Sequence, residues 1–323
     1  MTRQPVHPVL THDEYRAMLH EAELAGPVRG FGGWIAGLLA VSFASGGYVL
    51  LTVNSGITLV LSACLLASAM LLFQIVLHEC AHGVMFRQAP FNTIFGWLIG
   101  LVVLTPFFSY RRGHTAHHHY AGTDQDPTAA PCEPSRHRRF IELIVKLRLI
   151  PVLFLFGVYF PYLLYDLVPK SVQSKRRLLQ YGSNLLAIVF LHGSLAKVFG
   201  PALYLGVLAL AFWLSALFYE YLFTQHQHVG LIPVPRNSKR YRPREQQIFS
   251  RSIQIPFDSL LMFFNLHKEH HLFPHLPCGY LPRLHHWLQK NRPDVLQFTS
   301  DHLGIMKRRR DLKLYSPTVG DHD

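Results

Sequence analysis

Charged residues and cysteines are both scarce in this chain. Of its 323 residues only 15% are charged, whereas 50% are hydrophobic, a balance that favours one integral membrane domain over two soluble domains. The four cysteines form no CxxC pair, so neither a disulfide framework nor a zinc or rubredoxin-type site is indicated. The sequence also has no His-Pro-Gly-Gly haem motif and no GxGxxG fingerprint, which argues against a bound haem, flavin or nicotinamide.

The formal net charge of +12 is the one feature that would point to nucleic acid. Here, however, the basic residues gather in clusters between long apolar runs. That distribution is typical of loops that the positive-inside rule keeps on the cytoplasmic face of a membrane. We therefore expect a lipid bilayer, and no nucleic acid, as the partner of this chain.

Four apolar runs are predicted to span the membrane as helices. Two tight turns, at Asn54-Ser55-Gly56 and Phe199-Gly200-Pro201, join them in pairs, which predicts two antiparallel hairpins. The runs are Trp34–Val53, Ile57–Leu77, Leu185–Val198 and Ala202–Phe223. The predicted fold class is an all-α membrane protein with about four spans and a cytoplasmic helical cap, and six spans is the alternative.

Histidines occur in three clusters, each close to an apolar run. The first cluster has two histidines at i and i+4, and the other two have three histidines each, at i, i+3 and i+4. Such positions share one face of a helix, so the imidazoles of a cluster converge on one point. The eight residues are His78 and His82; His114, His117 and His118; and His267, His270 and His271. This pattern predicts a metal site in a membrane protein.

The number of histidines bears on the kind of site. Eight imidazoles exceed the four ligands of a zinc ion and suit two metal ions with open or water-filled positions. Imidazole binds zinc, copper, iron and nickel alike, so the ligand type selects no metal. A histidine-rich membrane metal transporter is an alternative of another class, but a conduction path would place polar ligands inside the spans rather than at their ends.

Two further apolar runs, Asn92–Phe108 and Leu149–Val168, are interrupted by glycine and proline. A crossing between the first two histidine clusters would separate them, so we expect the first run to be interfacial or re-entrant. The same count of crossings favours an interfacial position for the second run.

The expected organisation is a polar arm over residues 1–30, a membrane domain with its cap over residues 31–300, and a basic tail over residues 301–323. The arm has no signal-peptide pattern, and a short helix is expected over Thr11–Leu24, with Thr11 and Glu14 at capping-box spacing. If the short turns face outside, nearly all Lys and Arg are cytoplasmic. The expected location is a bacterial inner membrane, or its equivalent, with the site and both termini cytoplasmic.

A resemblance to a known family rests on the three clusters, which read HECAH, HTAHH and HKEHH. Together with the hairpins they resemble the integral-membrane fatty acid desaturases, which are related to membrane hydroxylases and carotenoid ketolases. The similarity runs from about His78 to Trp287. It implies two iron ions, with O2 as co-substrate, that remove hydrogens from a lipid chain. It also implies a ninth histidine after the last hairpin, where His226 matches the expected position and His228 is the competitor.

Polar residues next to the histidines are candidates for a supporting role in catalysis. Carboxylates orient ligand imidazoles and offset the charge of the metal, and the candidates are Glu79, Asp124, Asp126 and Glu269. The alternative interpretation of these four residues is that each is an exposed carboxylate on a helix or turn. Asn265 is expected either to bind a metal-bound water or to cap a helix. His192 lies inside an apolar run and is expected to pack structurally.

The resemblance implies electrons from a separate carrier, since the chain has no redox motif of its own. A ferredoxin-like acidic protein is expected at the basic cytoplasmic face. The leading interpretation is a desaturase that acts on fatty acyl or other lipid chains. A hydroxylase or ketolase on the same centre is the alternative, and the clusters do not separate the two because the outcome depends on where the second C–H lies.

Overall fold

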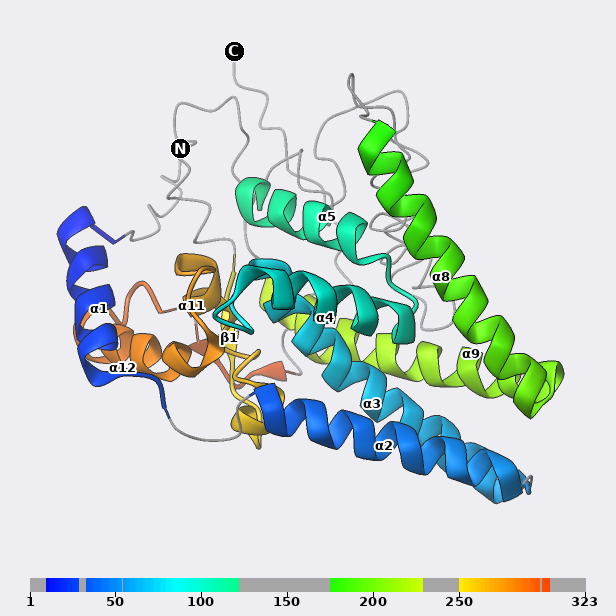
Figure 1. The fold of residues 1–323 in the computed structure, drawn as a ribbon. Coiled ribbons are helices and arrows are strands. Elements are labelled where there is room, and N and C mark those ends of the chain that lie inside the picture. Colours follow the sequence, from blue (N-terminus) through cyan, green and yellow to red (C-terminus); the bar gives the residue numbers. More distant parts are fainter. Residues whose placement is uncertain are drawn as a thin grey trace, which may run out of the picture.

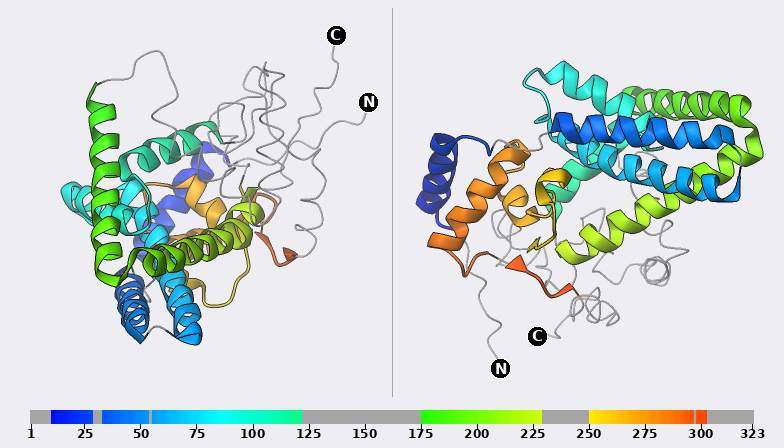
Figure 2. Two further views of the ribbon diagram at one scale, coloured as in Figure 1. Left: turned by 90° about the vertical axis from the view of Figure 1, so that its right-hand side faces the viewer. Right: turned by 90° about the horizontal axis from the view of Figure 1, so that it is seen from below.

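The computed structural model describes residues 10–28, 33–53, 55–121, 175–228, 250–296 and 298–302. These residues are mostly helical, with a set of long apolar helices and a smaller cap at one end of them (Figure 1). Seen from below, the cap lies at one end of the long helices, with its first and last helices side by side (Figure 2).

Four long helices form the two predicted hairpins. α2 (Gly33–Val53) packs along α3 (Gly56–His82), and α8 (Lys175–Phe199) is followed at once by α9 (Pro201–Phe218) (Figure 1). Each is long and apolar enough to cross a membrane, α9 together with the turns that extend it. The described residues thus confirm the two hairpins and the four predicted spans.

Local sequence explains where the hairpins turn. The Ser55 side chain accepts a hydrogen bond from Thr58 N–H and so caps the start of α3. Gly200 has a φ of +89°, which favours glycine, and Pro201 follows at the first position of α9, where its missing N–H costs nothing. The outward faces are apolar, with Leu186 and Phe190 of α8 73% and 78% exposed, as expected for a surface that lipid covers.

The run predicted over Asn92–Phe108 forms two helices instead of one. α4 (Ala89–Val102) and α5 (Phe107–Tyr120) meet at a bend of 108°. Gly96 permits this close approach, because a Cβ there would lie 2.3 Å from Cε2 of the buried Phe107 ring.

α4 and α5 do not carry the chain across the membrane. His82 at the end of α3 and His114 on α5 lie with their Nε2 atoms 2.8 Å apart, so the pair returns to the side from which it starts. This agrees with the expected re-entrant segment. The other interrupted run, Leu149–Val168, lies outside the described residues.

His192, inside the span α8, is bonded on both sides of its ring. Its Nε2–H donates to the backbone oxygen of Leu101 at 2.9 Å, and its Nδ1 accepts from the Tyr204 hydroxyl at 2.7 Å. Leu101 lies in the last turn of α4, where helix carbonyls have no partner within the helix. His192 therefore satisfies the end of the re-entrant helix, which agrees with the structural role expected for it.

The described part of the cap consists of three α-helices, two 3₁₀ helices and two short strands. They are α1 (His12–Ala25), β1 (Ser252–Ile253), η3 (Asp258–Leu261), α11 (His267–Leu272), η4 (Cys278–Tyr280), α12 (Leu281–Asn291) and β2 (Phe298–Thr299). β1 and β2 pair in parallel, with Ser252 opposite Phe298 and Ile253 opposite Thr299. The hydrophobic core of the cap includes Met18, Leu272, Phe273, Leu284 and Leu288 and is separate from the core between the long helices.

The predicted N-terminal helix is present and capped as expected. Thr11 and Glu14 form both hydrogen bonds of a capping box, and the helix runs one residue later than predicted at each end. α1 packs against α12, so the described part of the arm belongs to the cap.

Candidate metal centre

Three helices bring the histidine clusters together. The first cluster lies on the last two turns of α3, the second on α5 and the third on α11. The spacing of i, i+3 and i+4 places each cluster on one helix face, and the three faces converge. Six of the eight side chains are buried, with His78 only 1% exposed, and His82 and His118 are partly buried.

The first group of converging histidines has five members. They are His78, His82, His114, His118 and His270, and their ligand nitrogens all lie within 4.8 Å of one another. Within the group, Nε2 of His114 lies 2.8 Å from Nε2 of His82 and 3.1 Å from that of His118. Nε2 of His270 lies 3.1 Å from Nε2 of His118. All three sequence clusters therefore contribute to this group.

The second group has four members, His117, His228, His267 and His271, again with their ligand nitrogens within 4.8 Å of one another. Nε2 of His267 lies 3.0 Å from Nε2 of His228 and 3.0 Å from Nε2 of His271. Adjacent residues on α5, His117 and His118, thus face different groups, and so do the adjacent His270 and His271 on α11. The second and third clusters are therefore each divided between two groups, whereas the spacing predicted that each cluster converges on one point.

The electrostatics of both groups fit a bound cation. Burial lowers the pKa of His267, His270 and His271 well below the ordinary value of 6.5, so these imidazoles are neutral. A neutral imidazole carries one N–H and one lone pair, so the converging nitrogens cannot all be satisfied by bonding to one another. Within the part of the chain that the structure describes, Nε2 of His78 is buried without a hydrogen-bond partner. The nine nitrogens therefore suit two metal ions, although imidazole alone selects no particular metal.

The structure favours His228 over His226 as the ninth histidine, which corrects the preference drawn from the sequence. The ring of His226 lies 5.0 Å from that of His302 and outside both groups. Residues two apart on a helix point in nearly opposite directions, so only one of the pair faces the centre. The chain enters α10 (Gln225–His228) through the π-helix η1 (Tyr219–Thr224), and this change of helical phase is not evident from the sequence.

Glu79 is placed as its expected role requires. Nδ1–H of His78 donates to Oε1 of Glu79 at 3.2 Å, and Oε2 of Glu79 accepts from Cys278 N–H at 3.2 Å. The carboxylate thereby orients His78 with Nε2 toward the first group. Asp124 and Asp126 lie outside the described residues.

Glu269 and Asn265 have different partners from those expected. Glu269 is fully buried and accepts from Nδ1–H of His285 at 2.6 Å and from the Ser252 hydroxyl, so its carboxylate ties α11 to α12 and β1 instead of orienting a ligand ring. The Asn265 amide donates to Ile253 O at 2.9 Å and anchors β1, and the N-cap of α11 is the neighbouring Leu266. Helix capping by Asn265 is therefore wrong for α11.

His285 is a residue that the sequence analysis did not single out. A signal for it existed, because α12 buries Leu281, Leu284 and Leu288 on one face. His285 stands four residues after Leu281 and next to Leu284, so it lies beside that buried face.

Comparisons with known proteins agree with this geometry. The "Fatty acid desaturase" family matches residues 55–300. A "Fatty acid desaturase" of Bacillus subtilis (strain 168) is 27% identical over 241 residues, which cover 70% of this chain and 67% of that protein. The "Acyl-lipid omega-3 desaturase (cytochrome b5), endoplasmic reticulum" of Arabidopsis thaliana is 25% identical over 230 residues, which cover 63% of this chain and 56% of that protein.

Proposed function

This chain belongs to the fatty acid desaturase family, and from that premise we propose that it is an O2-dependent di-iron desaturase that introduces a double bond into a fatty acyl or other lipid chain. The observation that supports this most directly is the convergence of nine histidines in two groups at one end of four spanning helices. Its relatives make it an oxidoreductase, and the iron pair, the use of O2 and the electron donor are parts of the proposal.

Each of the two groups of histidines would hold one iron ion. When bound, the iron pair would supply the chemistry by which O2 takes two hydrogens from the lipid chain, and two electrons and two protons from outside, to give a double bond and two water molecules. The protein contributes the geometry: Glu79 keeps His78 oriented, and α11 joins the two groups because it carries His270 of one and His271 of the other. Asp126 and Asn265 remain proposed catalytic residues, Asn265 because its Oδ1 is buried and finds no hydrogen-bond partner in the described ranges.

The lipid substrate fits the surroundings of the centre. The end of α3 that carries His78 and His82 continues directly from an apolar span, so an acyl chain in the bilayer reaches the histidines along apolar helices. An apolar chain needs little beyond a matching shape to bind there.

We propose that both termini and the centre face the cytoplasm. α1 and α12 pack together in the cap beside the histidines, so the described ends of the chain lie on the side of the centre. Basic residues lie on the same side. Lys175 and Arg176 are exposed at the start of α8, which is the end away from its turn with α9. A ferredoxin-like acidic protein is the proposed electron donor at this face.

Lipid analysis of a host that expresses the chain with a ferredoxin system tests the function. New double bonds that disappear in His270→Ala, and persist in the exposed His20→Ala, are the expected result. New hydroxyl or keto groups dependent on His270 would replace the desaturase with a hydroxylase or ketolase on the same centre. Weakly held, exchangeable zinc in place of two tightly held iron ions would favour a metal transporter.

A further inference from the structure

The N-terminal helix α1 lies against elements that are far from it in sequence (Figures 1 and 2). Met18 is fully buried and Ala22 is 3% exposed, and both belong to the hydrophobic core of the cap. Their neighbours in that core include Phe273, which follows α11, and Leu284 of α12. α1 is thus a structural part of the region that holds the third histidine cluster.

Tyr15 is the residue of α1 that contacts the end of α11. Its ring stacks on that of Phe273, with the centroids 4.3 Å apart and the planes at 21°, and its hydroxyl donates to Leu272 O at 3.2 Å. Leu272 is the last residue of α11, where backbone carbonyls have no partner within the helix. Tyr15 therefore supplies a hydrogen bond that α11 does not provide for itself.

α11 depends on such contacts because it has only six residues. Isolated helices shorter than roughly 12 residues are marginal in water, so the position of α11 is set by its tertiary contacts. A shift of this helix would move ligands of both groups at once, since it carries His270 of the first and His267 and His271 of the second.

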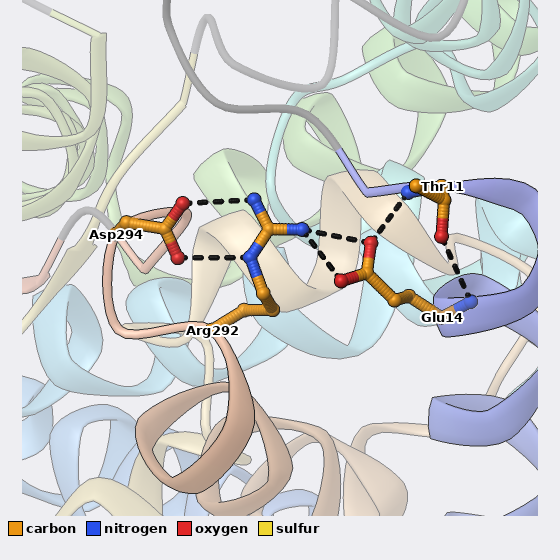
Figure 3. Close-up of polar contacts among 4 residues, drawn as sticks. All are labelled: Thr11, Glu14, Arg292 and Asp294. Carbon is orange, nitrogen blue, oxygen red and sulfur yellow. Dashed lines mark hydrogen bonds and ion pairs between the residues drawn. The ribbon is translucent and has the colours of Figure 1, made fainter.

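Arg292, just after α12, holds the first turn of α1 (Figure 3). Its Nη1 donates to the two carboxylate oxygens of Glu14 at 2.8 and 2.7 Å, while its Nε and Nη2 donate to the Asp294 carboxylate at 2.9 and 2.8 Å. Glu14 also accepts from Thr11 N–H at 2.7 Å. Glu14 directly precedes Tyr15, so this ion pair fixes the turn from which Tyr15 projects.

The other end of the segment is attached as well. Val28 N–H donates to Gly279 O at 2.8 Å, and Nε of Arg283 donates to Gly26 O at 3.4 Å. The backbone approaches closely here, because a Cβ at Gly279 would lie 3.1 Å from Cβ of Pro27. The segment is thus fastened at both ends of α1.

We propose that residues 10–28 form an N-terminal clamp that positions α11, with Tyr15 as its positioning residue and the Glu14–Arg292 pair as its latch. The clamp holds α11 at the end that carries His270 and His271, and so sets where the nitrogens of both groups converge. This inference rests on the proposed function in taking the histidines as metal ligands.

The rate of iron loss from the purified full chain tests the clamp. Iron-loaded protein in detergent is mixed with a ferrous chelator, and release is followed for wild type, Tyr15→Phe and Tyr15→Ala. Tyr15→Ala loses both the stack and the hydrogen bond, and is expected to release iron about tenfold faster. Tyr15→Phe keeps the stack and is expected to lie between the two. A wild-type release rate in Tyr15→Ala would overturn the proposal.

The latch has a matched control on the same helix. Glu14→Gln and Glu21→Gln each remove one negative charge from α1, but Glu21 is exposed and Glu14 binds Arg292. Faster iron release is expected in Glu14→Gln alone, and equal rates in the two variants would contradict the latch. Because Glu14→Gln changes a half-buried ion pair and not the core, it decides the question even if Tyr15→Ala fails to fold.

A spectroscopic measurement separates positioning from general stability. The visible absorption bands of the Co²⁺-loaded protein report ligand geometry, and they are expected to shift in Tyr15→Ala and not in Glu21→Gln. Unchanged bands in Tyr15→Ala would refute a positioning role. Wild type that holds iron tightly yet forms no new lipid product would contradict the proposed function and leave the clamp intact, whereas wild type that binds neither metal would contradict both.

Discussion

Nδ1–H of His285 donates to Oε1 of Glu269 at 2.6 Å, although the two side chains lie on different helices. Glu269 is fully buried and stands between His267 and His270 in the sequence, and its other oxygen accepts from Ser252. A buried carboxylate needs such donors, so His285 and Ser252 together make this position tolerable inside the cap. The third histidine cluster is thereby joined to α12 and β1.

Replacing His285 should destabilise the cap. His285→Ala removes one of the two donors to the buried Glu269, and is expected to lower the free energy of unfolding by about 1–3 kcal/mol. His286→Ala is the matched control, because His286 stands next in sequence and is exposed. Thermal unfolding of the purified proteins in detergent measures the difference. Equal midpoints for the two variants would argue that the bond contributes nothing to stability.

Iron content should distinguish the two candidates for the ninth histidine. His228→Ala removes a member of the second group and is expected to lower bound iron, as are His270→Ala and His118→Ala in the first group. His226→Ala is expected to retain iron, since its ring lies against His302. Elemental analysis of the purified variants decides the assignment, and loss of iron in His226→Ala alone would restore the preference drawn from the sequence.

Removing the amine of Lys268 should stabilise the protein. Lys268 is 1% exposed, its Nζ has no hydrogen-bond partner among the described residues, and burial lowers its pKa to about 7. A buried ammonium without a hydrogen-bond acceptor is costly, so Lys268→Met, which keeps much of the volume, is expected to raise the free energy of unfolding by about 1–3 kcal/mol. Lys290→Met on the exposed face of α12 is the control. A lower melting temperature for Lys268→Met than for Lys290→Met would show that the amine has a favourable partner.

The re-entrant pair should not accept a larger residue at Gly96. The Cβ of Gly96→Ala would meet the buried Phe107 ring, so this variant is expected to lose about 1–3 kcal/mol of stability. Gly206→Ala, on the span α9, has open space around the new Cβ and should be close to neutral. Unfolding midpoints compare the two. Similar stability would mean that α4 and α5 separate without cost.

Spacing along the chain was sufficient to predict local structure. Histidines at i, i+3 and i+4 lie on one helix face whatever surrounds them, so the clusters on α5 and α11 were predictable from sequence. The same holds for the capping box of Thr11 and Glu14 and for the hairpin turn at Ser55, because each depends on residues three positions apart. The apolar runs marked the candidate spans, and the requirement that the histidine clusters lie on one side of the membrane reduced them to four.

Contacts between distant segments were decided by the tertiary structure. Whether His226 or His228 joins the second group depends on the helical phase after a π-helical turn, which packing selects. The partner of Glu269 depends on where α12 docks, and the role of Tyr15 on where α1 docks. The sequence by itself determined which side chains share a helix face, whereas only tertiary packing determined which faces meet, because contacts between elements follow from the fit of whole surfaces and not from spacing.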